Sequence, residues 1–137
     1  MHYHQPVSKI MKRSKVLDVA ETDSVARAIQ LLDQCDVSAL PVKSAPDHFS
    51  GVISKSDIAS MKLLKHLQAG RSPAQIRVSE IMNHTPPLYV FDVDAIQKAI
   101  TLMHQRHIHR LFVADEQYEM IGVISTSDIL RMLVVNQ

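Results

Sequence analysis

Aromatic residues and cysteine are scarce in this sequence of 137 residues. Aromatic side chains make up only 4% and tryptophan is absent, so the sequence lacks the stacking surfaces that single-stranded nucleic acids require. The one cysteine, Cys35, excludes an internal disulfide and any zinc site built on several thiolates. Its place near the end of an amphipathic helix indicates a small buried apolar residue.

The chain also lacks a charge excess and a long hydrophobic run. Fifteen basic residues against fourteen acidic ones give a net charge of +1, which argues against a nucleic acid as partner. No apolar run approaches the roughly 18–20 residues that cross a membrane, and the N-terminus has no signal-peptide pattern. We therefore expect a cytoplasmic protein. No nucleophile–base pair or phosphate-binding loop appears, so we expect no enzymatic activity.

The sequence contains the same unit twice. The motifs VSKIM and GVISKSDI, which begin at Val7 and Gly51, recur 71 residues later as VSEIM and GVISTSDI. Between residues 7–59 and 78–130, about 20 of 53 positions are identical and no insertion is needed. A period of 71 residues is too long for a solenoid, so the duplication predicts two half-domains related by an approximate two-fold axis.

Each half is predicted to have the order β-α-β-β-α. Its first helix carries apolar residues at i, i+3, i+4 and i+7, with Asp23 or Asp94 as N-cap, and its second helix begins near Ser56 or Ser127. Strands this short are not stable alone, so we expect an α+β fold in which the sheets of the two halves pack together. The strands are expected at residues 17–19, 38–42 and 49–53, and again at 88–90, 109–113 and 120–124.

Four segments follow from this pattern: an N-terminal extension (1–6), a first repeat (7–59), a helical linker (60–77) and a second repeat (78–135). Apolar residues of the linker are predicted to continue the last helix of the first repeat. Gly70 would end that helix, and Pro73 would begin a short second one.

The repeated Ser-x-Ser-Asp junction between strand and helix carries the most specific chemistry. Free N–H groups and the helix dipole favour an anion at such a junction, and a serine hydroxyl can donate to a phosphate oxygen. The aspartate repels phosphate but accepts hydrogen bonds from the 2′,3′-diol of a ribose. The junctions consist of Ser54, Lys55, Ser56 and Asp57 in the first repeat and of Ser125, Thr126, Ser127 and Asp128 in the second.

A purely structural interpretation explains the same spacing. Ser-x-x-Asp at a helix start is a capping box, which stabilises the helix by about 1 kcal/mol without any ligand. Duplication does not separate the two interpretations, since a cap is copied as readily as a binding site.

The residues at the start of the next strand differ between the repeats. The second repeat has His109 and Arg110, which can bind phosphate, whereas the first has Ser38 and Ala39 at the matching positions. A surface pair on an edge strand accounts equally well for the histidine and the arginine. His104, His107 and His109 do not form a convergent metal set on this spacing, so we expect no metal site.

These motifs together resemble a tandem pair of CBS domains, the Bateman module, over roughly residues 7–135. The strings VSALPV and IHRLFV and the doubled GVIS-x-SDI carry the resemblance, which is greatest to the nucleotide-binding gamma subunits of AMP-activated protein kinase. The resemblance implies two βαββα units with two clefts between them, and pairs that commonly dimerise into a flat disk. Many members bind AMP, ADP or ATP, others S-adenosylmethionine or NAD, and many act as energy sensors on an effector protein.

The resemblance also implies two sets of site residues. One set joins the second junction to Lys12, Leu17, Ser38 and Ala39, and the other joins the first junction to Pro87, Leu88, Ile108, His109 and Arg110. The missing basic pair at Ser38 and Ala39 makes the sites unequal, so one is expected to be weak or empty. We therefore expect a regulatory homodimer that binds an adenosine-containing ligand. The alternative is a ligand-free scaffold for dimerisation or protein interaction.

Overall fold

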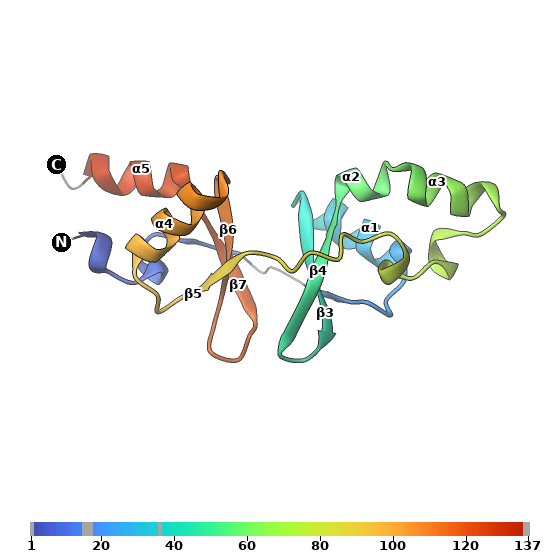
Figure 1. The fold of residues 1–137 in the computed structure, drawn as a ribbon, viewed down its shortest axis with the longest axis horizontal. Coiled ribbons are helices and arrows are strands. Elements are labelled where there is room, and N and C mark those ends of the chain that lie inside the picture. The colour runs from blue at the N-terminus through green and yellow to red at the C-terminus, as the bar shows by residue number, and fades with distance from the viewer. Residues whose placement is uncertain (1, 15–17, 36, 136–137) are drawn as a thin grey trace. The chain divides into compact units, whose positions relative to one another are not determined.

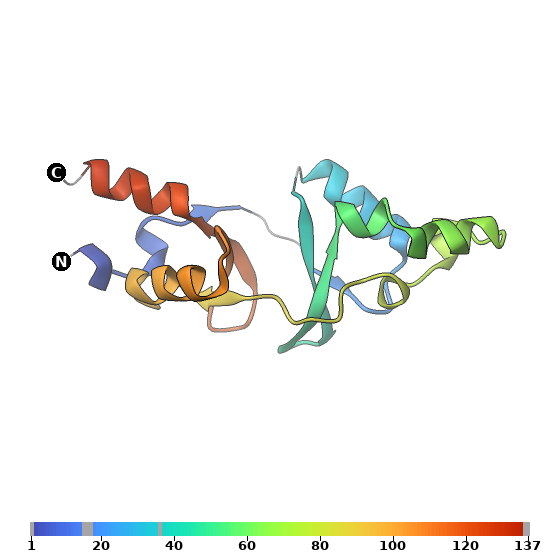
Figure 2. The same cartoon turned by 45° about the horizontal axis from the view of Figure 1, so that its top comes forward.

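The computed structural model describes residues 2–14, 18–35 and 37–135, which form two compact units (Figure 1). The terminal unit combines Met1–Lys15 with Leu88–Gln137, and the central unit is Val16–Pro87. Each unit contains one sheet with its main helices on one face, as the two views of the ribbon agree (Figures 1 and 2). The predicted α+β class and the β-α-β-β-α order of each repeat are confirmed.

The central unit has a three-stranded sheet in the order β2-β3-β4. β2 pairs parallel to β3, and β3 and β4 form an antiparallel hairpin. The parallel pair needs a crossover, which the amphipathic helix α1 supplies by burying its apolar residues against the sheet. The elements are β2 (Val19–Ala20), α1 (Val25–Gln34), β3 (Ala39–Ala45), β4 (His48–Ser54), α2 (Lys55–Ile58), α3 (Met61–Gln68), η3 (Pro73–Gln75) and η4 (Val78–Glu80).

The terminal unit repeats this plan with one more strand, in the order β1-β7-β6-β5. α4 crosses from β5 to β6, and α5 follows β7 as the last helix. Among the described residues, no helix is both long and apolar enough to cross a membrane. The elements are η1 (His2–His4), η2 (Val7–Lys9), β1 (Lys12–Arg13), β5 (Tyr89–Phe91), α4 (Ile96–Arg106), β6 (Arg110–Ala114), β7 (Met120–Ser125) and α5 (Thr126–Val135).

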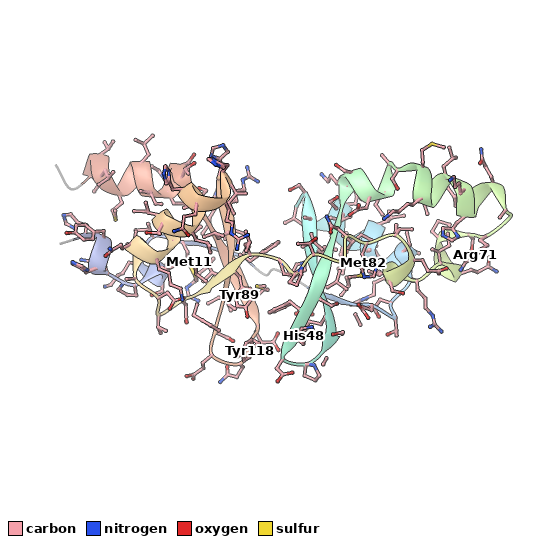
Figure 3. All side chains as sticks on the ribbon, viewed as in Figure 1. Met11, His48, Arg71, Met82, Tyr89 and Tyr118 are labelled. Carbon is pink, nitrogen blue, oxygen red and sulfur yellow. The ribbon has the colours of Figure 1, made fainter. Side chains whose placement is uncertain are left out.

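The two repeats exchange their opening segments. Val7 and Met11 belong to the first repeat but are buried in the core of the terminal unit, whose other buried residues come from the second repeat. Val78 and Met82 open the second repeat and are fully buried in the central unit. Figure 3 labels the two methionines in their separate units. The VSxIM motif therefore supplies core side chains to the hairpin of the other repeat.

Each exchanged segment runs against the last strand of a hairpin at a glycine. A Cβ on Gly51 would lie 2.2 Å from the carbonyl oxygen of Asn83, and one on Gly122 would lie 2.3 Å from that of Lys12. Both obstacles are backbone atoms, which a side-chain rotation cannot clear. The glycine of the repeated GVIS motif is thus required by the close approach of the exchanged segment.

Two sequence predictions about helix starts need correction. Ser24, not Asp23, is the N-cap of α1 and accepts a hydrogen bond from the amide of Arg27. Asp23 instead accepts one from the amide of Ala20 at 2.9 Å, closing the turn before the helix. Asp94 likewise accepts from the amide of Phe91 at 2.8 Å, and α4 begins without a side-chain cap. An aspartate one position before the N-cap is close enough in sequence to be mistaken for it.

The linker pattern predicts one continuous helix after the first junction, and this prediction is wrong. α2 ends at Ile58, and Ser60 starts α3 as its N-cap by accepting a hydrogen bond from the amide of Leu63. Gly70 has a φ of 84° just after α3, which confirms the predicted helix stop. Pro73 begins the 3₁₀-helix η3, as predicted.

An ion pair ties the segment after α3 to η4. The guanidinium of Arg71 donates to both carboxylate oxygens of Glu80, at 2.8 and 2.9 Å, and to the carbonyl oxygen of Gln75 at 3.0 Å (Figure 3). The hydrogen bond from Arg71, followed by one from the amide of Arg77, lowers the pKa of Glu80 to about 2. The pair fastens the connection between α3 and η4 within the central unit.

We expect Gly122→Ala and Gly51→Ala each to lower the free energy of unfolding by about 1–3 kcal/mol, because the exchanged segment must shift to make room. Ser50→Ala is the control, a change in the same strand as Gly51 without such an obstacle, and should stay within about 0.5 kcal/mol of wild type. Urea unfolding measures the three values. Equal stability of the glycine variants and the control would contradict the close approach.

Glu80 should make stability depend on pH in the acid range. Because folding lowers the pKa of this carboxyl from 4.5 to about 2, its contribution is present above pH 4.5 and is lost as the pH falls through about 2. Glu80→Gln should therefore flatten the acid limb of a plot of unfolding free energy against pH. Glu116→Gln, at an exposed position, is the matched control. If the acid limb of Glu80→Gln runs parallel to that of wild type, the lowered pKa of Glu80 is refuted.

Candidate functional site

The first junction is a closed capping box at the end of β4. The amide of Ser54 donates to Oδ2 of Asp57 at 2.8 Å, and the amide of Asp57 donates to the Ser54 hydroxyl oxygen at 3.2 Å. The Ser54 hydroxyl also lies 3.0 Å from Oδ2, and since a carboxylate only accepts, the hydroxyl proton points to the aspartate. These bonds hold the carboxylate against the strand end.

The second junction has the same geometry. The amide and the hydroxyl of Ser125 donate to Oδ2 of Asp128 at 2.8 and 2.9 Å, and the amide of Asp128 donates back to the hydroxyl at 3.2 Å. The capping interpretation of the Ser-x-x-Asp motif is therefore confirmed in both repeats. It accounts for the serine, for Oδ2 of the aspartate and for the place where the helix begins.

The first amides of the junction helices are mostly bonded within the protein. The amide of Lys55 donates to the carbonyl oxygen of Ser38 at 3.0 Å, and that of Thr126 donates to the carbonyl oxygen of His109 at 3.0 Å. With the third amide of each turn bonded to its serine, two of the first three N–H groups are taken within the protein. The hydroxyl protons of Ser54 and Ser125 are also used. The predicted role of the junctions in phosphate binding stays a prediction, and it depends on their other groups.

The aspartates differ in their second oxygen and in their burial. Within the described residues, Oδ1 of Asp57 has no hydrogen-bonding or ionic partner, and the residue is half-exposed. Asp128 is only 5% exposed, and its Oδ1 accepts a hydrogen bond from the guanidinium of Arg131. The sequence predicted two equivalent carboxylates, but the structure leaves one open and pairs the other.

The basic pair lies beside the second junction. Arg110 is the register partner of Ser125 in the β6–β7 hairpin, and the corresponding residue of the central unit, Ala39, is the partner of Ser54 in β3–β4. His109 and Arg110 are both exposed. The terminal unit therefore combines a histidine, an arginine and a paired aspartate, whereas the central unit combines a small residue and an open aspartate.

The predicted site residues are distributed over both units. Leu17 lies outside the described residues. The terminal unit contains Lys12, Leu88, Ile108, His109, Arg110 and the second junction. The central unit contains Ser38, Ala39, Pro87 and the first junction. Each unit thus brings together one junction and the start of the strand beside it.

Sequence reasoning missed a cavity beside each junction. In the terminal unit, a cavity of about 350 Å³ is lined by apolar residues of α4 and α5 and by His104, His107, His109 and Thr126. In the central unit, a smaller one of about 240 Å³ is lined by Ile29, Leu32, Asp33, Lys55 and Ile58. The 71-residue offset relates the five residues of the smaller cavity to residues of the larger, so the duplication was the signal that could have found them.

The histidines of the larger cavity are not grouped with further metal ligands. Over residues 2–14, 18–35 and 37–135, no three His, Cys, Asp or Glu side chains are grouped so that they could hold a metal ion.

The family follows from a direct comparison. The CBS domain model matches residues 7–63 and 78–135, which is most of the chain. The chain therefore belongs to the CBS-domain family and carries two copies of the domain.

Individual relatives are similar over nearly the whole chain. Hypoxic response protein 1 of Mycobacterium tuberculosis is 28% identical over 116 residues, which are 84% of this chain and 76% of that protein. The crystal structure of CBSX2 in complex with AMP has a TM-score of 0.66 and 26% identity, and the match covers 97% of this chain and 99% of that one. The gamma-3 subunit of 5′-AMP-activated protein kinase from Bos taurus is 28% identical over 86% of this chain, but the match spans only 24% of that subunit.

Proposed function

We propose that this protein is a regulatory module that binds an adenosine-containing ligand, with AMP, ADP or ATP ahead of S-adenosylmethionine and NAD. One observation carries the proposal: the capping box holds Asp57 in place while its Oδ1 stays open. A carboxylate oxygen with unused lone pairs accepts the hydroxyl groups of a ribose, and such charge-assisted bonds are the stronger ones. The similarity to an AMP-bound CBS protein supports this choice of ligand.

The remaining ligand contacts in this proposal come from the site residues that the resemblance implies. Among them, His109 and Arg110 are exposed and supply phosphate-binding groups in the terminal unit. Arginine suits this role, since its guanidinium forms two parallel bonds with a phosphate. The ligand undergoes no reaction, and its binding shifts the populations of the module's conformations by its differential affinity for them, which an effector protein then senses. A cytoplasmic location is part of the proposal.

We expect Asp57→Asn to weaken AMP binding roughly 10- to 100-fold, the effect of losing about 1.5–3 kcal/mol from a charged hydrogen-bond partner. Asparagine keeps an oxygen for the amide of Ser54, so the cap is disturbed less than it would be by alanine. Isothermal titration calorimetry measures the affinity, with 2′,3′-dideoxy-AMP as the ligand control. The dideoxy analogue should bind wild type and Asp57→Asn equally weakly.

Asp23→Asn is the matched protein control, because Asp23 also accepts from a backbone amide three residues away and lies in the central unit. It should bind AMP like wild type.

If no adenine nucleotide raises the melting temperature of the wild-type protein, the ligand-free scaffold becomes the better account. A nucleotide at 100 times its dissociation constant would add about 2.7 kcal/mol of stability.

We also propose that the protein is a homodimer. Apolar side chains of α5 are exposed on adjacent turns: Leu130 is 63%, Leu133 is 52% and Val134 is 61% exposed. Contiguous exposed apolar groups of this kind are typical of protein interaction surfaces. The dimerisation that the resemblance to CBS pairs implies makes a second copy of the chain the natural partner for this face.

Leu133→Lys should dissociate the dimer, because it places a charge within the apolar face of α5. Lysine is chosen because Lys62 occupies the equivalent position of the first repeat. Sedimentation equilibrium should give twice the 15.4 kDa chain mass for wild type and the chain mass for the variant at the same concentration. Val93→Lys is the control, since Val93 is 78% exposed but lies outside α5. A monomeric wild-type protein would contradict this part of the proposal.

A further inference from the structure

The two ribose-accepting carboxylates differ because of one pair of equivalent residues. The residue three positions after Asp128 is Arg131, whose guanidinium donates to Oδ1 of that aspartate. The offset of 71 places Ser60 at the same position after Asp57. The Ser60 hydroxyl donates to the main-chain carbonyl oxygen of Asp57, not to its carboxylate.

A count of lone pairs shows what this difference does. A carboxylate oxygen accepts about two hydrogen bonds. Oδ2 of each aspartate already receives two, from the amide and the hydroxyl of its serine. A ribose diol therefore depends on Oδ1, which has both acceptor positions open at Asp57 but already accepts from Arg131 at Asp128.

Burial strengthens the contrast. The side chain of Asp128 is 4% exposed and its Oδ1 accepts from the guanidinium of Arg131, whereas Asp57 is half-buried. A diol that approached Asp128 would compete with the guanidinium for Oδ1, and a buried carboxylate that loses its cation is costly. Among the described residues, no side chain competes for Oδ1 of Asp57.

We propose that Arg131 is a selectivity residue that closes the carboxylate of Asp128, so that the protein binds one adenosine ligand per chain, with its ribose on Asp57. This inference rests on the proposed function and refines it. It gives the repeats different roles: the first supplies the ribose acceptor, and the second is closed by its own helix α5. The expected weakness of the site that contains Asp128, Ser38 and Ala39 then has a structural cause.

The test exchanges the two equivalent residues. Arg131→Ser should open Asp128 and raise the stoichiometry of AMP in titration calorimetry from one to two per chain. Arg131→Met, which keeps the aliphatic stem without a donor, should do the same. Adding Asp128→Asn to Arg131→Met should return the stoichiometry to one. 2′,3′-Dideoxy-AMP should show no second site in any variant.

The reverse exchange closes the other carboxylate. Ser60→Arg should weaken AMP binding at least tenfold relative to Ser60→Ala, which removes the cap of α3 equally but adds no cation. Lys98→Ser is the control for removing a helical cation, since Lys98 pairs with Asp94 at 3.3 Å in the same unit as Arg131. It should leave the stoichiometry at one. Thermal unfolding confirms that each variant is folded.

The outcomes separate this inference from the proposed function. If neither Arg131 variant binds more AMP per chain than wild type does, the inference is overturned, whether or not wild type binds AMP. Weaker binding in those variants also overturns it, because it would show that Arg131 holds the ligand. If wild type binds no nucleotide and the Arg131 variants bind one, the selectivity role stands and the proposed function of the wild-type protein falls.

Discussion

The hydrogen bond from a serine amide to an aspartate three residues later is the interaction on which the functional part of this structure depends. It stops the strand, starts the helix and holds a carboxylate at the junction in one orientation. Without it the aspartate would be a mobile surface side chain, and ordering it for a ligand would cost conformational entropy. A structural cap and a binding group are thus compatible here, because they use different oxygens of one carboxylate.

Duplication placed this junction in both repeats, but the surroundings have diverged. The first junction is followed by Ser60, which breaks the helix and caps the next one, and the second is followed by Arg131 within one continuous helix. The difference between Ser60 and Arg131 therefore accompanies two changes: whether the helix is continuous, and whether Oδ1 of the neighbouring aspartate has a partner. Nearby, His109 and Arg110 correspond to Ser38 and Ala39, so charge has accumulated in the terminal unit. Repeats that share a fold need not share a binding role.

Local spacing explains which predictions succeeded. The apolar periodicity of α1 and α4, the stop at Gly70 and the Ser-x-x-Asp caps all concern residues within a few positions of each other, and the structure confirms them. The N-cap of α1 was misplaced by one residue because Asp23 and Ser24 are both good caps, and only the turn made by Ala20 decides between them. The break at Ser60 was missed because the apolar residues of α3 continue the helical pattern across it.

The duplication, the order of elements in each repeat and the residues that cap the second helix can be read from the sequence. These depend on contacts between near neighbours, whose spacing is visible in a linear string. Other features emerge only when the chain folds: the repeats exchange their opening segments, Gly51 and Gly122 give room for a crossing backbone, and the carbonyl groups of Ser38 and His109 accept from the junction amides. Those features depend on strand register and on which chain segment fills which core, and both are set when distant residues compete to be buried.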